Sequence, residues 1–135
     1  MAPPVLELTL PARPESVAEI RAAVRQFAVQ HGVDRDVLGS VALAVSEAAT
    51  NAVVHAFVDR APGIVRTLAR TGDDELIVHI ADDGRGMQPR VDSPGMGVGL
   101  PIIGQLARTL DIRQSGEAGT ELRMSFAAVG VRGTA

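Results

Sequence analysis

The segment LAVSEAATNAVVHAF, which runs from Leu43 to Phe57, combines a helix pattern with a set of polar groups. It is rich in alanine, the residue with the highest helix propensity. At helical pitch Glu47, Asn51 and His55 lie one turn apart along one edge. Burying such groups without partners costs a few kcal/mol. A hydrated divalent metal with an anionic ligand would satisfy them, and a solvated helix edge is the alternative. The apolar face of this helix is expected to consist of Val41, Ala44, Val45, Ala48, Ala52 and Ala56.

Length and composition indicate one globular domain. The chain has 135 residues, of which 46% are hydrophobic, enough for a substantial core. It has no cysteine, which excludes disulfides and thiolate metal sites. The N-terminus does not resemble a signal peptide, and no apolar run is expected to reach the roughly 20 residues of a membrane span. We therefore expect a cytoplasmic protein with no membrane partner.

The charge pattern excludes further classes of function. The formal net charge is −3 and the arginines are scattered, which argues against direct binding of nucleic acid through a basic face. The sequence contains no lysine at all. This excludes a Walker-type phosphate lysine, the strand lysine of eukaryotic-type protein kinases and Schiff-base chemistry. Any phosphate site in this chain must work without lysine.

Hydrophobic periodicity predicts an alternation of strands and helices. The order is strand, two helices, two strands, helix and two strands, which is typical of an α+β fold. We expect a two-layer α/β sandwich with helices on one face of a mixed, mostly antiparallel sheet. The domain should span residues 1–127, followed by a frayed tail at 128–135. Strands are expected at 5–10, 64–70, 75–81, 111–114 and 120–126, and helices at 14–31, from Asp34 or Asp36 to about Asp59, and at 98–109, with turns at 61–63 and 71–74.

Two glycine clusters follow the strand expected at 75–81. In the first, Asp82 at a strand end precedes Gly84 and Gly86, so a carboxylate could accept a hydrogen bond from an exocyclic amine while the glycines admit a flat ring. The second leads directly into a helix, whose free N–H groups favour phosphate. Either cluster alone is a weak signal and is more simply explained as an ordinary turn or loop. The residues of the second cluster are Gly95, Gly97, Gly99 and Leu100.

The three histidines have simpler interpretations than metal binding. His31 lies near a helix C-terminus, where a capping or solvated ring is favoured. His55 is expected to pack on its helix. His79 lies within a strand, opposite in direction to Val78 and Ile80, and is expected to be exposed or hydrogen-bonded.

Taken together, the motifs resemble a known family. Glu47-xxx-Asn51, Asp82-x-Gly84-x-Gly86 and Gly95-x-Gly97-x-Gly99-Leu100 are similar, in this order, to the N, G1 and G2 boxes of the GHKL superfamily. That superfamily unites gyrase-type ATPases and histidine-kinase catalytic domains through the Bergerat nucleotide-binding fold. The segment SEAATNAVVHA at 46–56 is most similar to the bacterial anti-sigma-factor serine-protein kinases. The resemblance covers roughly residues 5–127 and implies a histidine kinase-like ATPase domain.

The resemblance also implies roles for individual residues. Asn51 would help to bind Mg²⁺, and Glu47 would act as the general base. Asp82 would hold the adenine amine, with Thr120 at the same end of the site. Gly84 and Gly86 would allow the close approach of the base, and the second cluster, Gly95, Gly97, Gly99 and Leu100, would contact the phosphates.

The implied activity is a protein serine kinase that uses ATP and Mg²⁺. It would phosphorylate a serine of an anti-sigma factor antagonist, would sequester a sigma factor in its other partner state, and would form a homodimer. Two departures keep an alternative open: the segment from Met87 to Pro94 is short for a lid, and Asp92-Ser93-Pro94 stands where relatives often carry an arginine. The alternative is a non-catalytic, nucleotide-dependent binding module. A detached histidine-kinase catalytic domain is less favoured, because the chain offers no phosphoacceptor histidine helix.

Overall fold

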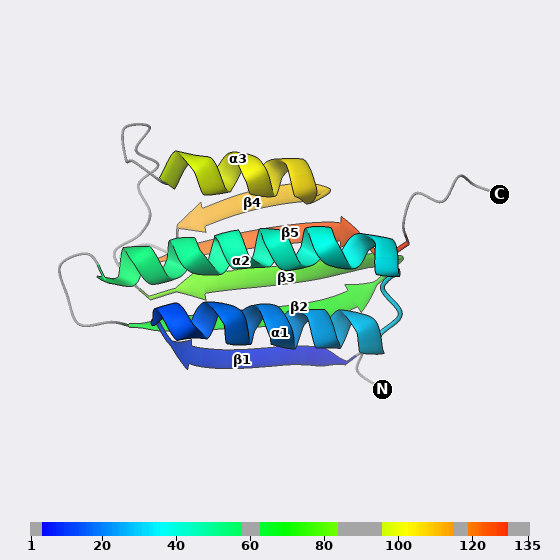
Figure 1. Cartoon of the computed structure of the whole chain (residues 1–135), viewed down its shortest axis with the longest axis horizontal. Coiled ribbons are helices and arrows are strands. Elements are labelled where there is room, and N and C mark those ends of the chain that lie inside the picture. The colour runs from blue at the N-terminus through cyan, green and yellow to red at the C-terminus, as the bar shows by residue number, and fades with distance from the viewer. Residues whose placement is uncertain (1–3, 58–62, 84–95, 115–118, 130–135) are drawn as a thin grey trace.

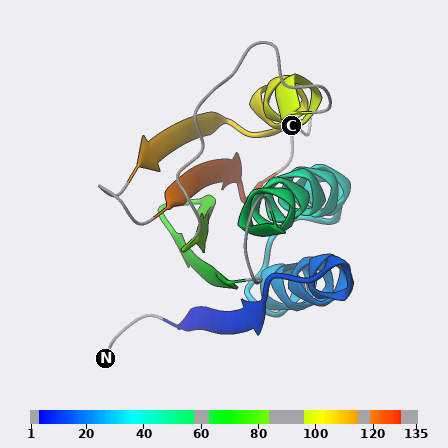
Figure 2. The same cartoon turned by 90° about the vertical axis from the view of Figure 1, so that its left-hand side faces the viewer.

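The structure, a computed structural model, describes residues 4–57, 63–83, 96–114 and 119–129, with backbone only at 55–57, 96–100 and 114. In these ranges three helices cover one face of a five-stranded sheet, and the other face is left open (Figures 1 and 2). The elements are β1 (Val5–Pro11), α1 (Pro14–Gln30), α2 (Arg35–Phe57), β2 (Ile64–Gly72), β3 (Glu75–Asp82), α3 (Met96–Leu106), β4 (Thr109–Gln114) and β5 (Thr120–Ala127).

The sheet confirms the predicted fold class. Its strand order is β1-β2-β3-β5-β4, and each described neighbouring pair is antiparallel. After β3 the chain passes through α3 and β4 before β5 returns to pair with β3. Because β3 and β5 are antiparallel, the end of β3 and the beginning of β5 lie at the same end of the sheet.

The ends of α1 follow from its sequence. Pro14 opens the helix, where a missing N–H has no cost. Gly32 terminates the helix with φ = +81°, as the sequence predicts. The N–H of Gly32 donates to the carbonyl of Val29 (3.3 Å), and that of Val33 donates to Ala28 (3.0 Å). These two bonds form a Schellman motif, with Val33 buried after it.

The hairpin between β2 and β3 is tighter than the expected turn at 71–74. Gly72 still pairs with Glu75, so only Asp73 (φ = 51°) and Asp74 (φ = 62°) form the loop. Two consecutive residues with positive φ are the geometry of a type I′ turn, whose twist matches that of paired strands. Aspartate tolerates this backbone conformation better than most residues do.

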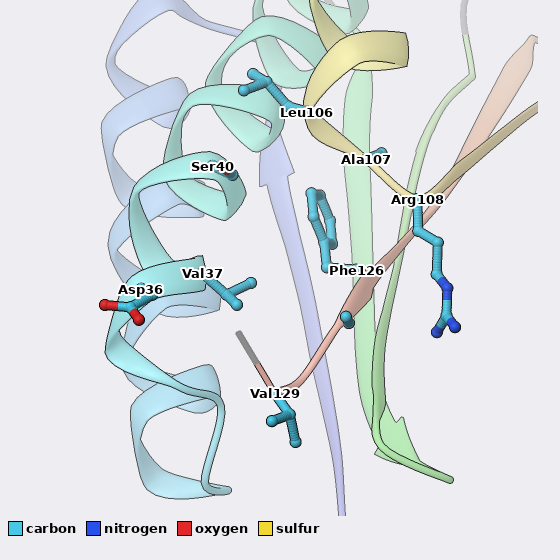
Figure 3. Close-up of a pocket in the computed structure, with 9 residues that line it drawn as sticks. Asp36, Val37, Ser40, Leu106, Ala107, Arg108, Phe126 and Val129 are labelled. Atoms are coloured by element: carbon cyan, nitrogen blue, oxygen red, sulfur yellow. The ribbon is translucent and has the colours of Figure 1, made fainter. Parts of the chain in front are cut away.

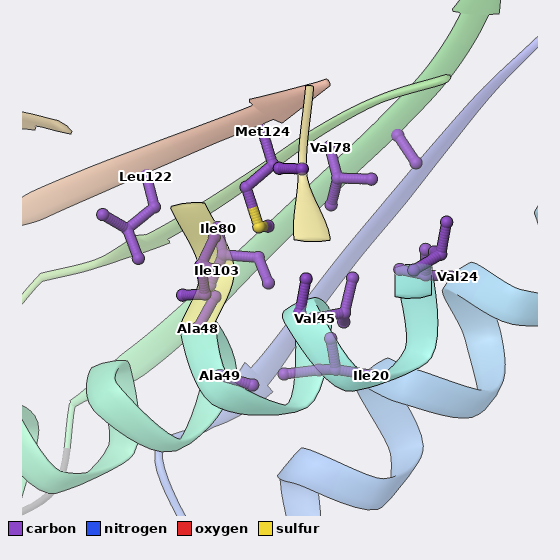
Figure 4. Packing of buried hydrophobic residues seen from close by; sticks show 14 of the residues in the cluster. Ile20, Val24, Val45, Ala48, Ala49, Val78, Ile80, Ile103, Leu122 and Met124 are labelled. Atoms are coloured by element: carbon purple, nitrogen blue, oxygen red, sulfur yellow. The ribbon is translucent and has the colours of Figure 1, made fainter. Parts of the chain in front are cut away.

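The core lies between the two layers. Alternation on β3 points Val78 and Ile80 toward the helices, and Leu122 and Met124 on β5 do the same (Figure 4). The expected apolar face of α2 is confirmed from Val41 to Ala52, where its members are at most 4% exposed; the side chain of Ala56 lies outside the described residues. Small residues on this face let α2 approach the sheet closely, which sets the depth of its polar groups. The helices add Ile20 and Val24 of α1, Val45, Ala48 and Ala49 of α2, and Ile103 of α3.

One expectation about α2 is wrong. The helix from Arg35 to Val54 is long and apolar enough to span a membrane by length and composition alone, although no such run was expected. Half of this window is buried inside the domain, between α1, α3 and the sheet. The hydropathy of α2 is therefore that of a core helix.

Two element boundaries near the C-terminus also differ from the prediction. Helix α3 begins at Met96 and ends at Leu106, and β4 begins at Thr109.

Beyond β5, the N–H of Ala128 donates to the carbonyl of Asp74, and the carbonyl of Ala128 accepts from the N–H of Asp34, both at 2.7 Å. The backbone is thus held through Ala128, and residues 130–135 of the expected tail lie outside the described part of the chain.

Candidate functional site

Four elements that carry predicted site residues meet at one end of the molecule. The C-terminal half of α2, the end of β3 and the beginnings of α3 and β5 all lie at the left of Figure 1, the end that faces the viewer in Figure 2. The antiparallel pairing of β3 with β5 enforces part of this arrangement. Motifs that are far apart in the sequence therefore share one region, as a common site requires.

On α2, the two polar residues of the opening segment differ in burial. Glu47 is half-buried, whereas Asn51 is only 5% exposed, deeper than its predicted place at the border of the face. The Asn51 Nδ2 group is buried and has no hydrogen-bond partner among the described residues. A buried amide without a partner costs about 1–3 kcal/mol. Among the described residues, the site therefore contains a buried donor that is open to a further partner.

A polar contact joins α1 to α2 one residue before Glu47. Ser46 Oγ donates to the carbonyl of Ala42 (2.8 Å), and Arg21 Nη1 lies 3.5 Å from the same Ser46 Oγ. Arg21 of α1 therefore places a positive charge next to Ser46, the residue that precedes Glu47 on α2. The side chain of the third polar residue, His55, lies outside the described residues.

At the sheet end, Asp82 and Thr120 occupy neighbouring strands. Ala81 of β3 pairs with Glu121 of β5, so Asp82 and Thr120 follow next in the register. They are 8% and 2% exposed, and both point toward the helix layer, as Ile80 and Leu122 do. The predicted proximity of an acid and a hydroxyl at one end of the site is thus built into the sheet.

Gly119 has a structural role here that the sequence did not predict. Its φ is +114°, a conformation that other residues rarely adopt, and a Cβ there would overlap the main-chain carbonyl of Asp82. The absence of a side chain lets β5 begin directly against the end of β3. The sequence signal was a glycine immediately before a strand, which is too common to be decisive.

Helix α3 begins two residues earlier than predicted, so Gly97 as well as Gly99 and Leu100 lies inside it. Gly97, Gly99 and Leu100 belong to the first turns of a helix that begins at Met96. Pro101 has no N–H, so the Gly97 carbonyl cannot receive its usual helical bond. Two glycines and a proline make this the least stable part of α3. Gly84, Gly86 and Gly95 lie outside the described residues.

A separate hollow lies at the other end of the domain. It has a volume of about 420 Å³ and is lined by Val37, Leu106, Phe126 and Val129, with Asp36 and Arg108 pointing outward on opposite sides (Figure 3). None of the predicted site residues lines it. It is therefore distinct from the site at the ends of β3 and α2.

The prediction that His79 is hydrogen-bonded within the sheet is confirmed. It lies half-buried on the open face of the sheet, where Nδ1 is 3.1 Å from Glu121 Oε2 of the neighbouring strand. This is a cross-strand polar pair of the kind that stabilises sheets.

The donor set fits a magnesium nucleotide better than a site made of protein ligands alone. Over the described ranges no three His, Cys, Asp or Glu side chains cluster as a metal site. Mg²⁺ is usually held by one or two side chains together with substrate phosphates. The orphaned Asn51 Nδ2 is a donor, so it fits a phosphate oxygen or a metal-bound water, whereas Mg²⁺ itself would be held by the amide oxygen of Asn51.

Comparison with known proteins shows the family to which the chain is similar. The family model described as histidine kinase-like ATPase domain matches residues 10–126. The anti-sigma F factor of Clostridium botulinum (strain Alaska E43 / Type E3) is 28% identical over 130 residues, covering 88% of this chain and 91% of that protein. The serine-protein kinase RsbW of Bacillus subtilis (strain 168) is 38% identical over 79 residues, covering 58% of this chain and 49% of that protein.

A solved structure supports the same fold. The crystal structure of the RsbU and RsbW domains of Rv1364c from Mycobacterium tuberculosis matches with a TM-score of 0.73 and 25% identity. The match covers 92% of this chain and 32% of that chain, so this chain spans about a third of the solved protein. The resemblance predicted from the three motifs is confirmed.

Proposed function

The chain belongs to the histidine kinase-like ATPase domain family, and we propose that it is an ATP- and Mg²⁺-dependent serine-protein kinase of the anti-sigma-factor type. Its substrate would be a serine of a small anti-sigma factor antagonist, and in its other partner state it would sequester a sigma factor. Relatives named anti-sigma F factor and serine-protein kinase RsbW support this proposal.

One observation carries the proposal. Asn51 is buried with an unpaired amide, one helical turn beyond the half-buried Glu47, at the end of the domain where Asp82 and Thr120 also lie. Binding of a magnesium nucleotide would give the amide a partner. The beginning of β5 at Gly119, which requires glycine, and the start of α3 lie at the same end of the domain.

The proposed roles are those that the family resemblance implies, and the positions of Glu47, Asn51, Asp82 and Thr120 support them. The serine oxygen would attack the γ-phosphorus, the bond to the bridging oxygen would break, and ADP would leave. Glu47 would accept the proton of the serine hydroxyl. Asp82 would accept a hydrogen bond from the adenine amine, and the N-terminus of α3 would face the phosphates. Mg²⁺, when bound with Asn51 as a ligand, neutralises phosphate charge, which is the main requirement of phosphoryl transfer.

Substitution of Glu47 separates binding from chemistry. We expect Glu47→Gln to retain ATP affinity within about twofold in calorimetric titration, because a neutral amide of the same shape replaces the carboxylate. Transfer to the antagonist serine, followed by mass spectrometry of the phosphopeptide, should fall by roughly 100-fold or more, the usual contribution of a general base. An unchanged transfer rate would remove Glu47 from the mechanism.

Asp82→Asn is the complementary variant. We expect it to weaken ATP binding itself, because a neutral amide oxygen is a weaker acceptor for the adenine amine than a carboxylate. Normal binding by this variant would contradict the adenine assignment. The two variants together assign one residue to catalysis and the other to recognition.

The rival function is a nucleotide-dependent binding module without useful transferase activity. The sequence Asp92-Ser93-Pro94, where relatives often carry an arginine, favours it, because a basic group there would neutralise γ-phosphate charge. Those residues lie outside the described part of the chain. Metal-dependent ATP binding with no phosphorylation of a co-purifying antagonist would support this module over the kinase.

The proposal extends to assembly and location. We place the protein in the cytoplasm, without direct contact to nucleic acid or membrane, and as a homodimer formed through β1 and α1. Light scattering coupled to size exclusion would test the dimer, and a monomer at micromolar concentration would contradict it.

A further inference from the structure

Asp83 makes a contact that the sequence did not predict. It follows Asp82 at the end of β3, and its Oδ1 accepts a hydrogen bond from the backbone N–H of Ile64, at 2.9 Å, although the two residues are 19 positions apart. The ladder between β2 and β3 ends at the pair Val65–Asp82. The Asp83 side chain thus continues the ladder by one step after the main-chain pairing stops.

Gly63 is shaped to receive this carboxylate. A Cβ on Gly63 would overlap Asp83 Oδ1 and would lie within 3.2 Å of Oδ2. The φ of Gly63 is not in the left-handed region, so backbone conformation alone does not require glycine here. The requirement is space: the missing side chain of Gly63 leaves the place that the Asp83 carboxylate fills.

The same point is tied to the N-terminal elements. The carbonyl of Gly63 accepts from the N–H of Ala12 (2.9 Å), and Ser16 Oγ, in the first turn of α1, donates to the carbonyl of Pro11 (2.5 Å). A continuous series of hydrogen bonds therefore connects the first turn of α1, the end of β1, the start of β2 and the end of β3. We call these residues (Pro11, Ala12, Ser16, Gly63, Ile64 and Asp83) the end clamp.

We propose that Asp83 is a positioning residue for nucleotide recognition, which acts by fixing the last residue of β3, Asp82, through the end clamp. The inference rests on the proposed function, because it assigns Asp82 to the adenine base. Asp82 is the last residue of β3 held by main-chain pairing, and Gly119 requires its carbonyl to stay in place. If the Asp83 contact is lost, no hydrogen bond to β2 holds the chain immediately after Asp82.

The test compares base discrimination in single and double variants. Asp83→Ala is expected to weaken ATP binding a few fold, less than the roughly tenfold effect of a lost hydrogen bond to a charged group, because the exposed contact with Ile64 acts on the nucleotide only through Asp82. GTP carries a carbonyl where ATP carries the amine, so the ratio of the GTP to the ATP dissociation constant should fall as Asp82 loses its fixed direction. Asp83→Asn keeps the Oδ1 acceptor and should restore both values to near those of the wild type.

Gly63→Ala provides an independent route to the same defect. Its Cβ would displace the Asp83 carboxylate, so we expect a loss of ATP affinity similar to that of Asp83→Ala. In the double variant the alanine at 63 meets no carboxylate, so its ATP affinity should be no lower than that of either single variant. Gly72→Ala, at the other end of the same strand, is the matched control, because a Cβ there meets nothing within 4 Å.

The outcomes are distinct. If the wild-type protein fails to bind ATP in calorimetric titration, the proposed function is wrong. If the wild type binds ATP but Asp83→Ala keeps its affinity and its GTP-to-ATP ratio, the positioning role of Asp83 is wrong. A variant that melts earlier but discriminates bases normally would assign Asp83 to stability alone and would also overturn the proposal.

Discussion

Replacing Asn51 by leucine should stabilise the ligand-free protein and abolish its binding of the magnesium nucleotide. The Asn51 amide is 95% buried, and its Nδ2 has no partner among the described residues, so the folded state carries an unsatisfied donor. Leucine has the same branched skeleton without polar atoms. Removal of such a group is worth about 1–3 kcal/mol, and leucine also has the higher helix propensity.

The size of the effect can be expressed as a melting temperature. An unfolding entropy of about 2.1 cal/mol/K per residue corresponds to about 0.28 kcal/mol/K for 135 residues. A gain of about 2 kcal/mol would therefore raise Tm by about 7 °C. ATP affinity in the presence of Mg²⁺ should fall by roughly tenfold to 100-fold, since a polar contact to a charged ligand contributes about 1.5–3 kcal/mol.

The assay is thermal unfolding without ligand, paired with calorimetric titration of ATP with and without Mg²⁺. Asn51→Ala guards against overpacking, because it removes the amide and leaves only a small void. Thr50→Ala, at the exposed neighbouring position, should leave both measurements nearly unchanged. If both Asn51 variants unfold at lower temperature than the wild type, the amide is satisfied in solution and the reasoning fails.

Three further predictions concern single residues. Thr67→Val should raise Tm by about 3–4 °C without changing ATP affinity, because the Thr67 hydroxyl is fully buried on β2 with no partner in the described structure; a lower Tm would reveal a hidden hydrogen bond. Gly119→Ala should cost about 1–3 kcal/mol of stability in denaturant titration and weaken ATP binding, because of its φ of +114° and its contact with Asp82; wild-type stability would contradict this backbone geometry. Gly104→Ala should stabilise α3 by about 0.5–1 kcal/mol, since a Cβ there meets nothing within 4 Å, and unchanged or lower stability would contradict this.

The fold was largely predictable because its signals are local. The apolar face of α2, the alternation on β3 and the stop at Gly32 each depend on residues within one element. What sequence reasoning missed was the exact extent of the elements. The hairpin closes at Asp73 and Asp74 because strand pairing continues to Gly72, and α3 begins at Met96, which places the second glycine cluster inside the helix.

The site was predictable in its residue types and less so in its contacts. Periodicity places Asn51 at the edge of the α2 face, but its burial depends on how far neighbouring elements cover that edge. Sequence reasoning assigned no role to Asp83, because its partner Ile64 is brought to it only by the register of two strands. The positive φ of Gly119 likewise follows from the approach of β5 to the end of β3.

The two ends of the domain differ in how well their polar groups are satisfied, and this difference is itself an argument for the location of the site. The end opposite the site is closed by backbone bonds: the Schellman motif at Gly32, the type I′ turn at Asp73 and the two bonds of Ala128. At the site end the Asn51 amide has no partner among the described residues, which costs stability, and Gly119 has a φ of +114° that glycine adopts readily and other residues rarely do. An orphaned group alone does not mark a site, because the Thr67 hydroxyl is orphaned too; Asn51 differs in lying at the same end of the domain as Asp82 and Thr120. A ligand that accepts a hydrogen bond from the Asn51 amide would offset this cost, whereas the opposite end is already closed by backbone bonds.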